Sequence, residues 1–347
     1  MARQVAPFDV ASVPPPWRKV LERELGKLRA REDVLALGIA GSFAYGDTWQ
    51  GSDLDVEVVV KGDKPKEVVT TEQEVSVDYG YFGETHLNEI PFETRPVYDP
   101  AKILTRELAS RDMNTEIERA IQGDLDRSQE LISRSKVALG KNPYSALALL
   151  QFGTNFLPHA FTLAAGDNRT LRRAVSRLER SCNMVQRPDF LELYGAILGF
   201  PKTLTRAEEL LTELEQGYRE VWTYFKGKPL GPRYMQLQPD SKAWFRNRIR
   251  PVYENDRRDL VWLVLAEFPF VLYFLFRLAG HERMPVDVFS EAAKFEGLPA
   301  LWRDRYRGVL RQFEQEQVPM LIDTGEKLLA EVRELSTAKL WTQQKQP

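Results

Sequence analysis

The feature that most constrains the fold of this sequence is a glycine turn between two short strand-like runs. The apolar run 34–40 ends at Gly41, and the valine-rich run 54–60 begins beside Asp53 and Asp55. Short apolar runs bounded by glycine and turn residues predict buried strands. Glycine also lets the backbone turn tightly and approach a bulky anion. The segment therefore predicts a strand, an anion-binding turn and a second strand that carries carboxylates.

The carboxylates themselves predict a metal site. Asp53 and Asp55 are two residues apart, which places both side chains on one face of a strand. Carboxylates this close repel each other unless a cation lies between them, and oxygen-only ligands suit Mg²⁺. Asp78 falls on the polar face of the alternating segment 75–82 and is expected to be the third ligand or a general base. Two-metal in-line displacement uses such a set. Glu57, one step further along the strand, is interpreted as a salt-bridge partner.

Phosphate is the expected anion at the turn. A helix starting after Ser42 would direct its free N–H groups at a phosphate, and the Ser42 hydroxyl would add a hydrogen bond. Lys136, on the first long helix after the sheet, is a candidate cation that could reach across a cleft. A solvated helix face is the alternative for Lys136. The same two interpretations apply to four other basic residues: Lys61, Arg134, Arg172 and Arg173.

These motifs resemble a known signature. Gly41-Ser42, ten residues, and then Asp53-Leu54-Asp55-Val56 is similar to the signature of the DNA polymerase β-like nucleotidyltransferase superfamily. Ala44-Tyr45-Gly46 and Ser52 also resemble residues of the minimal bacterial members and of the aminoglycoside nucleotidyltransferases. The resemblance is close for residues 30–60 and extends to about residue 100. Tyr45 is a departure, since many minimal members have arginine at that position.

The resemblance implies a fold and an activity. It implies a mixed sheet flanked by helices, and Mg²⁺-dependent transfer of an NMP from an NTP, with ATP expected, to a hydroxyl group while pyrophosphate leaves. Gly41 and Ser42 carry over as triphosphate contacts, with Ser52 counted beside them as a nucleotide contact. Asp53 and Asp55 carry over as metal ligands, and Asp78 takes the third position, whose spacing is not fixed in the family.

The pattern along the chain predicts an α+β domain followed by an all-α domain. We place the catalytic domain at 1–100 and the helical domain at 101–347, with two helical subdomains, 101–230 and 231–347, as an alternative. The expected strands are 34–40, 54–60, 68–69, 75–82 and 95–98. The expected helices are 17–31, 101–109, 113–139, 144–165, 168–184, 189–198, 204–226, 240–248, 256–279, 286–295, 298–316 and 318–339.

Composition narrows the expected partners and location. The 48 basic and 50 acidic residues nearly balance, so nothing demands nucleic acid as a partner. The single Cys182 cannot form an internal disulfide and is expected in the core of a cytoplasmic protein. The N-terminus shows no secretory signal. The apolar segment 260–280 is interrupted by charges and Pro269, and so predicts a buried helix rather than a membrane span.

Three functions are compatible with this site. The first is transfer of an NMP to a small hydroxylated acceptor, with the helical domain forming the acceptor pocket. The second is nucleotidylation of a protein or a tRNA, as in toxin–antitoxin relatives; the balanced charge counts against RNA. The third is a non-catalytic nucleotide-binding regulatory module, which a missing carboxylate would indicate, and no carboxylate is missing. Related enzymes often pair as homodimers, although no interface is readable from this sequence.

Overall fold

The computed structural model describes residues 5–63, 67–72, 74–167, 173–225 and 245–342. The chain forms two compact units: unit 1 contains Met1–Glu116 and Phe225–Pro251, and unit 2 contains Ile117–Tyr224 and Val252–Gln346. This division differs from the boundary expected at residue 100, and it places 117–224 and 252–346 in one unit rather than in two subdomains. Unit 1 extends beyond residue 100 because helix α3 (Ile103–Ser110) packs against the sheet.

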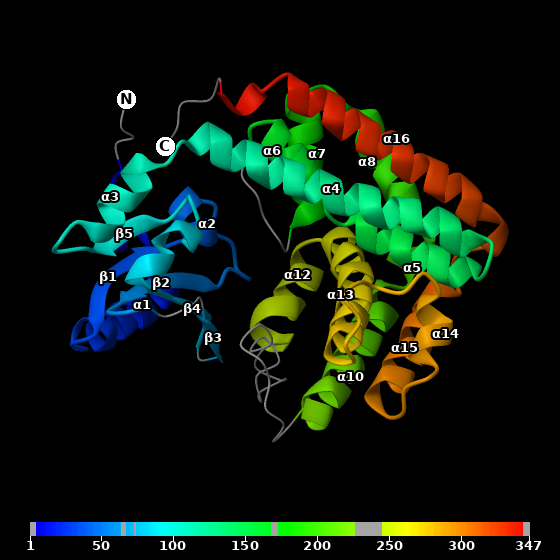
Figure 1. Cartoon of the computed structure of the whole chain (residues 1–347), viewed down its shortest axis with the longest axis horizontal. Helices are drawn as coiled ribbons and strands as arrows, with labels where there is room; N and C mark the ends of the chain where they lie inside the picture. The colour runs from blue at the N-terminus through cyan, green and yellow to red at the C-terminus, as the bar shows by residue number, and fades with distance from the viewer. Residues whose placement is uncertain (1–4, 64–66, 73, 168–172, 226–244, 343–347) are drawn as a thin grey trace. The chain divides into compact units, whose positions relative to one another are not determined.

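Unit 1 is built on a five-stranded mixed sheet of order β3-β4-β2-β1-β5 (Figure 1). Among the strands that the structure describes, only β2 and β4 pair in parallel, and the register places Asp55 opposite Asp78. The mixed sheet agrees with the expected α+β architecture. The strands are β1 (Val34–Ile39), β2 (Leu54–Val60), β3 (Glu67–Glu72), β4 (Ser76–Gly83) and β5 (Arg95–Tyr98).

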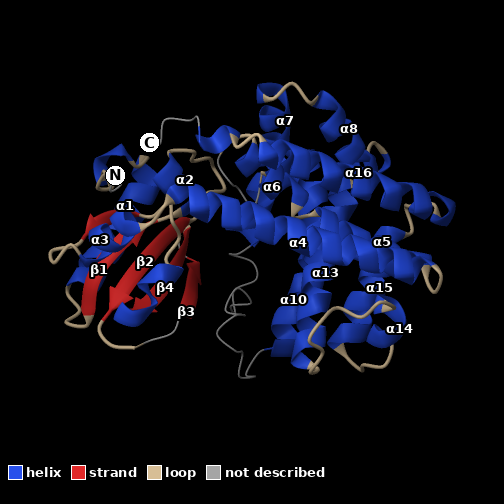
Figure 2. Ribbon diagram, turned by 45° about the horizontal axis from the view of Figure 1, so that its top comes forward, coloured by secondary structure: helices blue, strands red, loops and turns tan. Residues whose placement is uncertain are grey.

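Side-chain alternation divides the residues of β2 between two cores. Leu54, Val56 and Val58 are buried with residues of α1 (Pro15–Arg29) in one cluster. Val59 is buried on the opposite face, in a cluster that includes Leu104 and Leu108 of α3 (Ile103–Ser110). Because side chains two residues apart share a face, Asp55 projects from the same face as Val59. Figure 2 shows the strands in red with the helices of unit 1 beside them.

Unit 2 is helical, and its core is rich in aromatic side chains. The long helix α13 (Arg257–Leu278) packs against α5 (Pro143–Thr154), α7 (Ala174–Met184) and α15 (Leu298–Leu310). Helix α16 (Val318–Thr337) packs against α5, α6 (Leu157–Ala164) and α8 (Pro188–Ile197). The fully buried Trp302 donates its indole N–H to the Phe268 carbonyl over 2.9 Å. Cys182 is also buried, and burial raises the pKa of its thiol to about 12, as fits the core position expected from the sequence.

The remaining helical segments are short ones in both units and the longer helices, most of which belong to unit 2. The short segments are η1 (Val10–Ser12), α2 (Gly41–Tyr45), η2 (Glu84–Glu89), α9 (Lys202–Thr205), η4 (Phe245–Ile249), α12 (Arg250–Asn255), α14 (Val288–Ala292), η5 (Gln315–Gln317) and η6 (Leu340–Thr342). The longer helices are α4 (Met113–Leu139), α5 (Pro143–Thr154), α6 (Leu157–Ala164), α7 (Ala174–Met184), α8 (Pro188–Ile197), α10 (Ala207–Phe225), α13 (Arg257–Leu278), α15 (Leu298–Leu310) and α16 (Val318–Thr337).

Several expected helices differ from those observed: the helix expected at 298–316 ends at Leu310, and the one expected at 286–295 covers only Val288–Ala292. The helix expected at 144–165 is divided into α5 and α6, because the chain breaks at Asn155-Phe156 and Pro158 occupies the first turn of α6, where its missing N–H costs nothing. The helix expected at 240–248 lies partly outside the described residues. Its described end is the π-helix η4, which α12 follows directly.

Helix α13 contains the apolar segment for which the sequence predicts a buried helix rather than a membrane span. By length and composition it is apolar enough to cross a membrane, and 78% of its most apolar window is buried inside the protein. Extensive burial of this kind is typical of a core helix. The observed burial agrees with the buried helix expected at this position.

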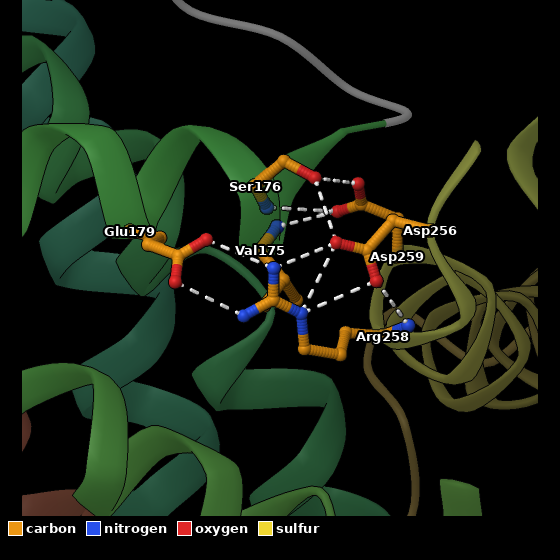
Figure 3. Close-up of polar contacts among 6 residues, drawn as sticks. All are labelled: Val175, Ser176, Glu179, Asp256, Arg258 and Asp259. Carbon is orange, nitrogen blue, oxygen red and sulfur yellow. Dashed lines mark hydrogen bonds and ion pairs between the residues drawn. The ribbon is translucent and has the colours of Figure 1, made fainter.

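A polar cluster links the beginnings of α7 and α13 (Figure 3). The fully buried carboxylate of Asp259 accepts hydrogen bonds from the Val175 N–H (2.7 Å), the Ser176 N–H (3.1 Å) and the Ser176 hydroxyl. Arg258 bridges Glu179 and Asp256, each over 2.8 Å. Asp259 therefore caps α7 from another helix, since the N-cap residue of α7 makes no side-chain cap of its own.

The Asp259 cap predicts a pH-dependent stability. Burial raises the pKa of Asp259 from 3.8 to about 6, although its hydrogen bonds oppose the shift. The folded state therefore retains a proton that the unfolded state has lost, and stability falls as pH rises through about 6. Relative to Asp259→Asn, which keeps an acceptor oxygen, the wild type should lose up to about 1.4 kcal/mol of unfolding free energy per pH unit in this window. Urea unfolding of both proteins at about pH 5 and about pH 7.5 measures this difference, and an equal difference at both pH values would contradict the assignment.

Candidate metal centre

The turn after β1 requires glycine at residue 41. Gly41 has φ +60°, in the left-handed region, and opens the single-turn helix α2. A Cβ at this position would lie 2.0 Å from Oδ2 of Asp55. The glycine is therefore needed twice, for its backbone conformation and for the space that the Asp55 carboxylate occupies. Gly46, also with a positive φ (+70°), ends α2.

Hydrogen bonds hold the loop that leads into Asp53. The Trp49 N–H donates to the Ser52 hydroxyl oxygen over 3.0 Å, and the Ser52 N–H donates to the Trp49 carbonyl over 2.9 Å. Trp17 of α1 donates its indole N–H to the Ser52 carbonyl over 2.8 Å. Ser52 is buried, and its hydrogen bonds stabilise this loop. Its role as a nucleotide contact stays a prediction.

The structure brings Asp53, Asp55 and Asp78 together. One carboxylate oxygen from each lies within 4.8 Å of those of the other two, and all three residues are partly buried. Asp55 and Asp78 are paired across the parallel strands β2 and β4, and Asp53 directly precedes β2. The parallel register explains the proximity that strand alternation predicted. These three residues, called the aspartate triad below, could hold a metal ion.

A buried arginine from a distant part of unit 1 contacts the aspartate triad. The Arg248 guanidinium donates to both carboxylate oxygens of Asp78, over 2.6 and 3.0 Å, and lies 3.1 Å from Oδ2 of Asp53. Its side chain is only 3% exposed. Sequence reasoning missed this residue: 170 positions separate it from Asp78, and nothing distinguishes it in sequence from the neighbouring Arg246 and Arg250.

Glu57 lies beyond the aspartate triad on the same face of β2. It is 7% exposed, and it faces Gly80 across the β2–β4 pair. A Cβ on Gly80 would be 2.1 Å from Oε2 of Glu57, so the glycine leaves room for this carboxylate. The interpretation of Glu57 as a salt-bridge partner remains a prediction.

The expected phosphate contacts have different surroundings. The Ser42 hydroxyl oxygen is buried without a hydrogen-bond partner among the residues that the structure describes. Buried polar groups are normally hydrogen-bonded, so this hydroxyl fits a group that bonds a ligand. Lys136 lies in unit 2 and forms an ion pair of 2.6 Å with Glu326. Arg134 donates to the Met284 carbonyl, also within unit 2. Lys61 is exposed in the turn after β2, and Arg172 lies outside the described residues.

The residues present fit a hard divalent cation. The three carboxylates offer only oxygen ligands, which suits Mg²⁺ better than a softer metal. The position of Arg248 shows that a positive charge is favoured there. Comparison of the sequence with models of known protein families and with curated proteins finds no match. The assignment of this centre therefore rests on its geometry and on the sequence motifs.

Substitution of Gly41 should damage the metal site specifically. Gly41→Ala adds about 1–2 kcal/mol of backbone strain and also displaces the Asp55 carboxylate, so we expect Mn²⁺ affinity to fall at least about tenfold. Isothermal titration calorimetry with Mn²⁺ measures this effect. Gly46→Ala is the matched control, because it introduces a similar φ penalty but its Cβ would meet no atom within 4 Å. Equal Mn²⁺ affinities for the two variants would contradict the role given to Gly41.

Proposed function

We propose that this protein is a Mg²⁺-dependent nucleotidyltransferase that transfers an NMP, with AMP expected, from an NTP to the hydroxyl of a small-molecule acceptor. The observation that carries the proposal is the aspartate triad beside the Gly41 turn, with a buried Ser42 hydroxyl on that turn. The combination of grouped carboxylates and a turn able to approach phosphate suits phosphoryl-transfer chemistry. The resemblance of residues 30–60 to polymerase β-like nucleotidyltransferases supports the same activity.

In the proposed reaction, Asp53, Asp55 and Asp78 would hold the metal. Bound Mg²⁺ supplies charge neutralisation for the phosphates and for the attacking oxygen. The acceptor oxygen forms a bond to the α-phosphorus, and the bond from that phosphorus to the bridging oxygen of the β-phosphate breaks, so that pyrophosphate leaves. The hydroxyl proton passes to the Asp78 carboxylate as general base. Ser42 donates a hydrogen bond to the triphosphate at the turn.

Incubation with NTPs labelled in the α-phosphate tests the reaction. With Mg²⁺ and a panel of hydroxylated metabolites and aminoglycosides, we expect label on a small molecule and release of pyrophosphate. Asp53→Asn and Asp55→Asn should each lower turnover at least about a thousandfold, because each removes a ligand charge from the metal site. Asp33→Asn, at an exposed carboxylate paired with Arg31, should retain turnover.

Three results would count against this function. Label on protein or tRNA instead of a small molecule would show that the acceptor is a macromolecule. ATP binding without pyrophosphate release for any acceptor would indicate a regulatory module. Wild-type turnover in either aspartate variant would remove the aspartate triad from the chemistry.

A further inference from the structure

Arg248 contacts two of the three carboxylates that would hold a metal ion at the aspartate triad. Its guanidinium bridges Asp53 and Asp78, and it binds Asp78 through two parallel hydrogen bonds. Bidentate, buried arginine–carboxylate pairs are the strongest type of charge-assisted hydrogen bond. Arg248 belongs to η4, and so the contact comes from outside the two segments that carry the aspartates. The guanidinium is thus a cation from the protein itself at a site built for cations.

We propose that Arg248 is the exchangeable counter-cation of the aspartate triad: guanidinium and divalent metal compete for the same carboxylate oxygens, and metal binds only as Arg248 leaves them. The inference rests on the proposed metal site. The chain thus carries its own competitor for that site, and this competitor stabilises the metal-free state.

Charge and geometry both require the exchange. Three carboxylates with oxygens within 4.8 Å of one another repel strongly, and one guanidinium offsets part of that repulsion in the metal-free state. Mg²⁺ takes oxygens at about 2.0–2.1 Å in a near-ideal octahedron. The Asp78 oxygens are directed at the Arg248 nitrogens instead, and a guanidinium and a metal ion would repel each other at this separation. The two cations therefore exclude each other from Asp78.

The backbone of the arginine is fixed close to the site. Phe245 and Ile249, which flank Arg248 in η4, are buried at 6% and 1% exposure. Pro251 lies near the loop before Asp53, because a Cβ on Gly51 would be 3.0 Å from the Pro251 Cβ. The tether keeps the local concentration of guanidinium at the aspartate triad high, so competition from Arg248 is intramolecular and independent of protein concentration.

The same exchange frees the proposed general base. While Arg248 holds both oxygens of Asp78, that carboxylate cannot take a proton from an acceptor hydroxyl. If Arg248 released Asp78, the carboxylate would have an oxygen able to accept that proton. Arg248 thereby couples the presence of metal to the readiness of the catalytic carboxylate.

Mn²⁺ titration of the full chain, followed by electron paramagnetic resonance, tests the competition without any measurement of activity. Arg248→Met removes the competing cation while keeping much of the side-chain volume, so Mn²⁺ should bind at least about tenfold more tightly than to the wild type, a change of about 1.4 kcal/mol. Arg246→Met is the matched control. It removes an equal charge from an exposed position on the same π-helix and should leave the Mn²⁺ affinity within about twofold of wild type.

Thermal unfolding provides the second readout. Without metal, Arg248→Met should melt below the wild type because the aspartate triad loses its counter-cation, and saturating Mn²⁺ should raise its Tm by more than it raises that of the wild type. If Arg248→Met does not fold without metal, Arg248→Lys serves instead. A lysine keeps the charge but loses the bidentate geometry, so its Mn²⁺ affinity should still exceed that of the wild type.

The outcomes separate this inference from the metal site itself. Mn²⁺ binding that Asp55→Asn abolishes, but that Arg248→Met leaves unchanged or weakens, would overturn the competition and keep the metal site. Mn²⁺ binding that Asp55→Asn leaves unchanged would overturn both. Tighter binding in Arg248→Met, together with its loss in the double variant with Asp55→Asn, is the result we expect.

Discussion

Repulsion among three neighbouring carboxylates is the physical constraint on which unit 1 depends. Asp53, Asp55 and Asp78 are brought together by the parallel pairing of β2 with β4, and this arrangement is stable only if positive charge is present. Arg248 supplies that charge within the chain. The segment that carries Arg248 lies between the two segments of unit 2 in the sequence, and it belongs to unit 1.

The space for these carboxylates is created by glycines rather than by polar neighbours. Gly41 gives Asp55 room at the end of β1, and Gly80 gives Glu57 room on β4. In both places a methyl group would collide with a carboxylate oxygen. Sheet packing on the two faces by α1 and α3 then holds the strands rigid, so the acidic groups cannot relax apart by movement of the backbone.

Local patterns in the sequence predicted the elements of unit 1 well and its long-range contacts poorly. Alternation placed Asp55 on the polar face of its strand, and the structure puts it opposite Asp78. Arg248 was missed because no local pattern records which of several arginines returns to a site 170 residues away. The break between α5 and α6 was missed for a related reason: the residues of 144–165 are mostly apolar and nearly all buried, so periodicity does not show where one buried helix ends.

The discontinuity of unit 1 has a consequence for how the protein is made. The aspartate triad leaves the ribosome with the first part of the chain, whereas Arg248 follows only after Ile117–Tyr224, the first of the two segments of unit 2, has been synthesised. Until then the nascent sheet carries its acidic groups without their arginine. During this interval a divalent cation held by the three carboxylates would offset their repulsion in place of Arg248.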